Sequence, residues 1–175
     1  MPETSSHLAQ VNIARIAAPL DSAQMSGFMT QLDAINALAD ASPGFVWRYQ
    51  DHLGNATSLR PYPEDDRIIF NMSVWETLAA LTAYVYHSGH AAPMRRRREW
   101  FLPFDGPYQA LWWLPAGTLP TIEDARQRLA HLRAHGPTPT AFTFRRFFAP
   151  DGAETPGPAL SADTLLNTPR LPPTP

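Results

Sequence analysis

Two reactive side chains are missing from this sequence of 175 residues, which contains no cysteine and no lysine. Without cysteine there is no thiolate nucleophile, no disulfide and no sulfur ligand for a metal. Without lysine there is no side-chain amine for Schiff-base chemistry, and all fourteen basic residues are arginines. The side chains left for acid–base or nucleophilic chemistry are histidine, the carboxylates, tyrosine and serine.

Long apolar runs and an excess of charge are missing as well. No segment approaches the roughly 20 apolar residues needed to cross a bilayer, and the first residues do not form a basic stretch followed by an apolar run. The formal charge is only −2, which argues against general binding to nucleic acid. A Gly-rich phosphate loop, a serine-nucleophile elbow and the HExxH pattern are also absent. We therefore expect a cytoplasmic protein with no membrane or nucleic-acid partner.

Hydrophobic periodicity predicts the order of helices and strands. Period-two alternation marks four strands, at residues 8–16, 44–50, 67–75 and 107–116. Apolar residues three and four apart mark two helices, one capped by Asp21 or Ser22 and ended by "ASPG", and one over 76–87. The order β-α-β-β-α-β is the split βαβ of the ferredoxin-like plan. It gives an α+β fold with a four-stranded antiparallel sheet and both helices on one face.

The sequence continues beyond this plan. Thr121 and Asp124 form a capping-box pattern at the start of a further helix. The segment "AFTFRRFF" (141–148) alternates as a fifth strand, which extends this sheet or a partner's. From residue 149 onward the chain is rich in Pro, Ala and Thr and nearly free of aromatic residues. We therefore expect one domain over 7–148 and a mobile, Pro-rich C-terminal tail over 149–175.

The two faces of the predicted sheet differ in polarity. The third strand alternates between an apolar set and a mixed set, namely Ile68, Phe70, Met72 and Val74 against Ile69, Asn71, Ser73 and Trp75. We expect the apolar set to lie beneath the two helices. The other face would carry the mixed set with Asn12 and either Trp112 or Trp113, according to the register of the fourth strand. Amides and a hydroxyl among indole rings are typical of a small-molecule cavity. A sheet-to-sheet dimer interface without a cavity is the alternative.

A basic stretch, "HSGHAAPMRRRREWF" (87–101), follows the second predicted helix. Its Ser-Gly pair interrupts that helix, and a new helical segment resumes toward Trp100. Spacings of four, three and four place one stripe of this segment toward the protein, consisting of His90, Met94, Arg97 and Phe101. The other arginines would fan over the remaining faces with their charge in solvent.

Two residues of this stripe are candidates for catalysis. Histidine titrates near neutrality, so His90 is the candidate base for an acidic phenol or enol. The guanidinium of Arg97 can clamp a carboxylate or a phenolate. The alternatives are a hydrogen-bonded structural or surface histidine at position 90 and an ion pair of Arg97 with an acidic residue such as Glu99 or Asp105. Tyr86 and Trp100 are further candidate substrate contacts, although packing in the core explains them equally well. His87 and His90 lie three residues apart and could share a metal. No third ligand lies at a recognisable spacing, so we expect no metal.

Three blocks of the sequence resemble a known family. The segments "NMSVWETLAALTAYVYHSGHAAPMRRRREWF", "LWWLPAG" and "HGPTPTAFTFRRFF" are similar to the bacterial domain-of-unknown-function family DUF3291, and the likeness covers about residues 7–148. That family resembles in turn the dimeric α+β-barrel superfamily, which includes antibiotic-biosynthesis monooxygenases and heme-degrading monooxygenases. The resemblance implies a homodimer in which two ferredoxin-like sheets form a barrel, with a pocket between sheet and helices in each protomer. Heme-degrading relatives carry a strand Asn, a pocket Trp and a proximal His, and Asn12, Trp75 and His90 are the candidates for those roles.

These patterns together suggest a homodimeric enzyme for an aromatic or polyketide-like metabolite. The reaction would be cofactor-independent oxidation or proton transfer such as isomerisation or cyclisation. His90 would be the base and Arg97 would hold an anion, while Asn12, Asn71 and Ser73 would orient substrate oxygens. No cofactor is expected, and a heme-binding, monooxygenase-like protein with His90 as axial ligand is the variant within this class. A non-catalytic protein that binds a metabolite is the alternative from another class.

Overall fold

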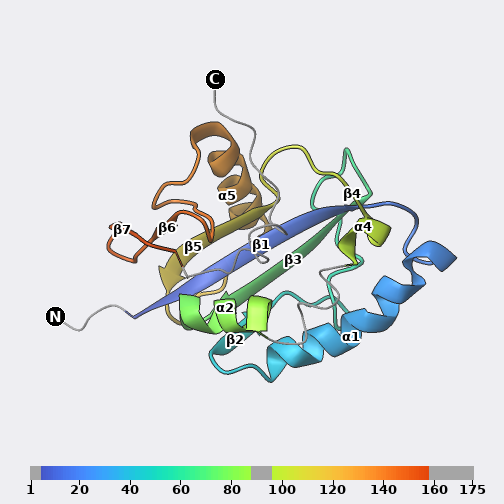
Figure 1. The fold of residues 1–175 in the computed structure, drawn as a ribbon, viewed down its shortest axis with the longest axis horizontal. Helices are drawn as coiled ribbons and strands as arrows, with labels where there is room; N and C mark the ends of the chain where they lie inside the picture. The colour runs from blue at the N-terminus through green and yellow to red at the C-terminus, as the bar shows by residue number, and fades with distance from the viewer. Residues whose placement is uncertain (1–4, 88–95, 158–175) are drawn as a thin grey trace.

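One antiparallel sheet forms the centre of the computed structural model, which describes residues 5–87 and 96–157 (Figure 1). Its strands are β1 (Ser6–Ile16), β2 (Phe45–Arg48), β3 (Ile68–Trp75), β4 (Phe101–Leu102) and β5 (Gln109–Pro115). The long β1 pairs with β3 along one edge and with β5 and then β4 along the other. β2 pairs with the free edge of β3. The predicted ferredoxin-like α+β arrangement is therefore confirmed.

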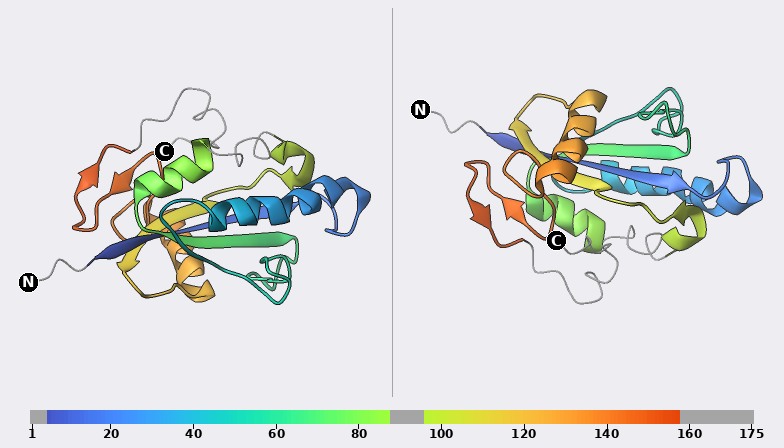
Figure 2. Two further views of the ribbon diagram at one scale, coloured as in Figure 1. Left: turned by 90° about the horizontal axis from the view of Figure 1, so that it is seen from below. Right: turned by 90° about the horizontal axis from the view of Figure 1, so that it is seen from above.

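Helices cover both faces of the sheet (Figure 2). The helices and the short 3-10 turn of the described residues are η1 (Ala23–Met25), α1 (Ser26–Asp40), α2 (Leu78–His87), α4 (Arg97–Trp100) and α5 (Ile122–His135). α1 and α2 lie on one face. α4 packs against η1, which directly precedes α1. α5 lies on the opposite face.

Side-chain caps define the starts of two of these helices. The hydroxyl of Thr121 accepts from the backbone N–H of Asp124 at 3.1 Å, and the Asp124 carboxylate accepts from the backbone N–H of Thr121 at 2.8 Å, which confirms the predicted capping box. Thr77 caps α2 by accepting from the backbone N–H of Ala80. The first helix differs from expectation, because Ser22 precedes η1 without making a side-chain cap and α1 begins only after that turn.

The two sheet faces are covered in the opposite way to the prediction. The apolar set of β3 lies under α5, not under α1 and α2. α5 buries Ala125, Leu129 and Leu132 against this face, and the β2–β3 connection (residues 49–67) adds the half-buried Tyr62. The mixed set of β3 consequently faces α1 and α2. Alternation states which side chains share a face, but it does not state which helix covers that face.

This covering bears on the expected dimer. A barrel of two sheets would join the faces that lie opposite α1 and α2, and α5 occupies this position. The core residues that β1, β3 and β5 contribute to that face are at most 9% exposed in the single chain. A face-to-face pairing of two sheets would therefore require α5 to move, and the homodimer stays a prediction.

The segment after α5 also departs from the prediction of a fifth strand over 141–148. Phe142 makes only an isolated bridge to Leu111 of β5. The chain then forms a separate hairpin of β6 (Phe147–Phe148) and β7 (Glu154–Thr155). β7 falls within the expected tail at 149–175, of which residues 149–157 are described and the rest lie outside the described residues.

Hydrogen bonds to two charged side chains order the β2–β3 connection. The carboxylate of Asp51 accepts from the hydroxyl of Ser58 at 2.6 Å and from the backbone N–H of Ser58 at 3.0 Å. These bonds, the hydroxyl first, lower the pKa of Asp51 to about 2. The buried Arg48 forks onto the carboxylate of Asp40 at 2.7 and 3.1 Å and donates to the carbonyl of Gly54 at 2.8 Å. The end of α1, β2 and the connection are thereby held together.

Leu129→Ala tests the role of α5 as the cover of the sheet. Leu129 is 4% exposed, so truncation leaves a cavity in the core and should lower the free energy of unfolding by about 2–4 kcal/mol. Urea denaturation followed by tryptophan fluorescence measures the change. Leu119→Ala, at a leucine that is 53% exposed, is the matched control and should change stability by less than about 0.5 kcal/mol. Equal losses in the two variants would contradict the packing described.

Asp51→Asn tests the ordering of the connection through its pH dependence. The folded pKa of about 2 lies below the ordinary value of 3.8, so the ionised carboxylate stabilises the protein above about pH 4 and this contribution is lost as the pH falls toward 2. The variant should be less stable than the wild type at pH 7, and the gap should narrow between pH 4 and pH 2. Denaturant midpoints over that range measure it. A gap that stays constant with pH would argue against the assignment.

Candidate functional site

A cavity lies between the mixed face of the sheet and the helices α1 and α2. Its volume is about 230 Å³, just below the roughly 300–1,000 Å³ of pockets for drug-sized ligands. Most of its walls are apolar or aromatic side chains, among them Phe28, Leu32 and Ile35 of α1. Its uncharged polar lining residues, apart from tyrosines, are Gln10, Asn12, Asn36, Thr57, Asn71 and Gln109. An apolar cavity with a few polar groups is the ordinary composition of a small-molecule site.

A row of hydrogen bonds runs through the sheet wall of this cavity. The indole N–H of Trp75 donates to the hydroxyl of Ser73 at 2.9 Å. The amide nitrogen of Gln10 donates to the same hydroxyl at 3.1 Å and to the amide oxygen of Asn71 at 3.0 Å. The register of β1 against β3 sets Gln10 opposite Ser73 and Asn12 opposite Asn71. The row is thus buried at its tryptophan end and lines the cavity at Gln10 and Asn71.

The helix wall contributes one amide of its own, from Asn36 of α1. This residue is 7% exposed and lines the cavity, and none of the described residues hydrogen-bonds its side chain. The amide of Asn36 is therefore accessible from the cavity without a partner among the described residues, and a ligand or water there can bond to it. Asn36 was not among the predicted site residues. The signal was its spacing of four from Leu32, which puts an amide on the inner face of an otherwise apolar helix.

Arginine and tyrosine side chains form a further part of the lining. The guanidinium carbon of Arg97 lies 5.4 Å from the ring centroid of Tyr108, and both residues line the cavity with Tyr86. Burial raises the pKa of Tyr86 to about 12 and also raises that of Tyr108. Both phenols therefore stay protonated at neutral pH and can donate hydrogen bonds. The charge of Arg145, which follows Phe144 in the chain, acts on both phenols in the opposite direction, and sequence reasoning had not singled it out.

The structure places the expected site residues in different positions. Asn12, Asn71, Tyr86 and Arg97 come from four different elements and all line the cavity. Ser73 and Trp75, which were expected to contact substrate, are 5% and 0% exposed and are not part of the lining. They reach the cavity only through the hydrogen bonds of Gln10, a residue that the sequence analysis had not included in the site.

Two other expected contacts lie away from the cavity. The register of β5 puts Trp112 on the face under α5, where the guanidinium of Arg128 lies 6.0 Å from its ring. Trp113 is the one on the side of α2, and it donates to a carbonyl of β6. Trp100 is 3% exposed and packs against Phe28 at 5.9 Å between ring centroids. Neither Trp112 nor Trp100 is a lining residue, which corrects both expectations.

The basic stretch is described only in part. His90 and Met94 lie outside the described residues, while Arg97 and Phe101 of the same stripe line the cavity. Glu99, considered as a partner of Arg97, pairs instead with Arg96 at 2.7 Å. Within the described ranges, no three His, Asp or Glu side chains converge as metal ligands. In the same ranges, no His, Asp or Glu lines the cavity.

Heme was the cofactor variant that the sequence left open. A porphyrin is larger than most drug-sized ligands, and these already occupy pockets of roughly 300 Å³ or more. The described walls enclose about 230 Å³, so they do not accommodate heme without opening. We assign no step of the chemistry to heme.

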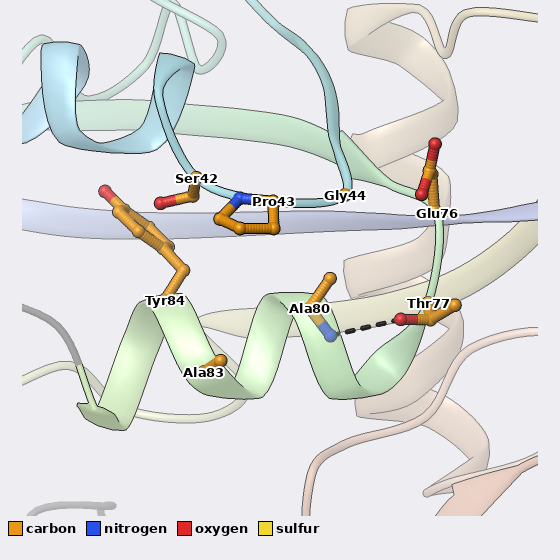
Figure 3. A pocket seen from close by; sticks show the side chains of 8 residues that line it. All are labelled: Ser42, Pro43, Gly44, Glu76, Thr77, Ala80, Ala83 and Tyr84. Atoms are coloured by element: carbon orange, nitrogen blue, oxygen red, sulfur yellow. Dashed lines mark hydrogen bonds between the residues drawn. The ribbon is translucent and has the colours of Figure 1, made fainter.

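A second hollow, of about 400 Å³, lies between α2 and the turn that joins α1 to β2 (Figure 3). Gly44 in this turn has a φ of 76°, and a Cβ there would lie 2.6 Å from that of Ala80, so only glycine allows this close approach. Tyr84 rises from α2 toward Ser42 at one end of the hollow. The hollow is also lined by the acidic residue Glu76. The hollow lacks the converging amides of the cavity.

No described helix combines the length and the apolar character that crossing a membrane requires.

Several solved structures are similar to part of this chain, including the following three. PA3566 from Pseudomonas aeruginosa is 16% identical, with coverage of 66% of this chain and 99% of its own and a TM-score of 0.42. NE2512, a protein of unknown function from Nitrosomonas europaea, is 14% identical, with coverage of 68% and 99% and a TM-score of 0.42. A monooxygenase from the gene ActVA-Orf6 of Streptomyces coelicolor, in complex with the ligand Nanaomycin D, is 16% identical, with coverage of 67% and 95% and a TM-score of 0.39. No curated protein matches the chain.

A family model described as "Domain of unknown function (DUF3291)" matches residues 7–158. The match begins within β1 and extends past β7, so it includes both walls of the cavity and the cover formed by α5. The chain belongs to the DUF3291 family.

Proposed function

We propose that the protein binds a small, planar aromatic molecule with oxygen substituents and acts on it, either by oxidation with molecular oxygen or by proton transfer. The observation that carries this proposal is the lining of the cavity. Its apolar and aromatic walls suit a ring system, and its amides on two sides, Asn71 on the sheet and Asn36 on α1, suit the oxygens of that ring. The volume, about 230 Å³, suits a molecule smaller than a drug-sized ligand.

The lining favours a substrate that becomes an anion during the reaction. The amide of Asn71 and the protonated phenols of Tyr86 and Tyr108 are hydrogen-bond donors, and Arg97 carries a positive charge. Such groups stabilise a phenolate or enolate, and they act more strongly in a cavity with little water. Oxidation of a phenol and isomerisation of an enol both pass through such an anion, so both reactions belong to the proposal.

Formation of that anion needs a base. The tyrosines with raised pKa are poor bases at neutral pH, and no His, Asp or Glu is among the described lining residues. His90 is the proposed base because an imidazole titrates near neutrality, and it lies outside the described residues.

The atoms and electrons of such an oxidation balance with molecular oxygen alone, without a cofactor. With 1-naphthol as the test substrate, one atom of molecular oxygen enters the ring carbon opposite the hydroxyl. The other oxygen atom leaves as water with two hydrogens of the substrate, and the product is 1,4-naphthoquinone. The protein's part is to bind the ring, exclude water and hold the phenolate.

A second candidate function is binding without catalysis. It is favoured by the same lack of a base among the described lining residues.

The expected homodimer and cytoplasmic location also remain proposals. Because α5 covers the apolar face of the sheet, a dimer would form through another surface.

Binding of 1-naphthol tests the cavity. We expect it to quench tryptophan fluorescence of the wild type, and Asn36→Leu should weaken binding about tenfold because one hydrogen bond to a buried amide is lost. Ala34→Leu places the same side chain on the exposed side of α1 and should leave the dissociation constant unchanged. If the wild type does not bind 1-naphthol at its solubility limit, or if both variants bind equally, the assignment of the cavity fails.

Turnover by His90→Ala separates the two candidate functions. Naphthoquinone formation from 1-naphthol in air, and α-proton exchange of 2-tetralone in deuterium oxide, measure oxidation and proton transfer. The variant should lose turnover by a factor of about 10²–10⁴ while 1-naphthol affinity stays within about twofold. His52→Ala, at an exposed histidine of the β2–β3 connection, is the matched control. A wild type that binds 1-naphthol but performs neither reaction would favour the binding protein.

A further inference from the structure

The direction of the hydrogen bond at the buried end of the row, between Trp75 and Ser73, is fixed by chemistry. An indole N–H can only donate, so the hydroxyl oxygen of Ser73 must accept from Trp75, as it does at 2.9 Å. Trp75 is fully buried and stacks on Tyr84 with 5.0 Å between ring centroids, so its indole is held in place. The row therefore starts from a fixed donor.

Gln10 forms the middle of the row and uses both of its N–H donors there. One bonds to Ser73 at 3.1 Å and the other to the amide oxygen of Asn71 at 3.0 Å. Gln10 is 5% exposed. If the amide of Gln10 turned over alone, its oxygen would face the oxygen of Asn71, and the hydrogen bond between them would be replaced by a repulsion of two acceptors. Asn71 is exposed, so water can solvate its amide, but the bond between the two side chains is kept only if both amides turn over together.

Gln10 and Asn71 both line the cavity, and Asn71 is the end of the row there. Its amide oxygen accepts from Gln10 and is turned toward it, so its two N–H donors are turned the other way. Asn71 lines the cavity, and among the described residues none accepts a hydrogen bond from this nitrogen. The orientation of Gln10 thus decides whether Asn71 offers donors or an acceptor to a ligand.

We propose that Gln10 is a positioning residue that makes Asn71 present N–H donors, so that the cavity selects ligands with an accepting oxygen at this point. Such ligands are quinones, ketones and phenolates, and ligands that only donate are disfavoured. This inference rests on the proposed function, because it takes the cavity as the binding site. It adds which atom of the ligand faces the sheet and which residue enforces that choice.

Gln10→Glu tests the direction of the row with almost no change in shape. An ionised carboxylate only accepts, so Asn71 should turn to donate to it and offer its own oxygen to the cavity. We expect the wild type to bind 1,4-naphthoquinone, which only accepts, more tightly than 1-naphthylamine, which donates. In Gln10→Glu at pH 9 the ratio of the two affinities should shift toward the amine by about tenfold or more. Gln10→Leu, which leaves Asn71 unconstrained, should give a ratio between these two.

A measurement without ligand distinguishes failure of this inference from failure of the proposed function. In ¹⁵N spectra, the side-chain amide protons of Asn71 should exchange quickly with water in the wild type and more slowly in Gln10→Glu, where they donate to the introduced carboxylate. The indole N–H resonance of Trp75 should also shift. Unchanged Asn71 exchange in a folded Gln10→Glu or Gln10→Leu variant, or an unchanged affinity ratio, overturns the positioning role. If the wild type binds neither probe while the exchange changes as expected, the positioning role stands and the proposed function fails.

Discussion

The packing of α5 on the apolar face of the sheet is the interaction on which the rest of the structure depends. That face carries apolar residues of β1, β3 and β5, each at most 9% exposed. Burial of one large apolar side chain contributes roughly 1.5–3 kcal/mol, so this face supplies far more stabilisation than any single polar contact in the molecule. Because the core is secured there, the opposite face is free to carry polar residues, and α1 and α2 can lie over it with a cavity between.

The polar row in the opposite face illustrates what this freedom allows. Trp75, Ser73, Gln10 and Asn71 put four polar groups where a sheet would otherwise carry apolar side chains, and each is matched to the next by donor and acceptor. The three bonds from Trp75 to Asn71 are all made, which favours one arrangement of the buried members of the row. The cavity wall therefore presents a fixed pattern of hydrogen-bonding groups rather than a set of independent side chains. The phenols and the guanidinium complete that pattern from other elements.

Local sequence patterns predicted the elements well, because the determinants lie within a few residues. Alternation located β1 and β3, and the Thr121–Asp124 spacing located the start of α5. Long-range choices were not predictable in this way. Period-two alternation is the same whichever helix covers a face, so the positions of α5 and of Trp112 depended on register and packing.

Two residues near the site were not predicted from the sequence. A single amide in an apolar helix stripe, such as Asn36, does not by itself indicate a binding site, and only the cavity beside it suggests a role. Arg145 alternates as a strand residue would, but its segment turns into a hairpin instead.

The described lining residues of the cavity come from segments far apart in the sequence, from Gln10 in β1 to Gln109 in β5. No short fragment of the chain can assemble such a site, so the site exists only in the folded domain. A ligand of this cavity therefore binds the folded state and not the unfolded one, and its binding adds to the stability of the fold by mass action.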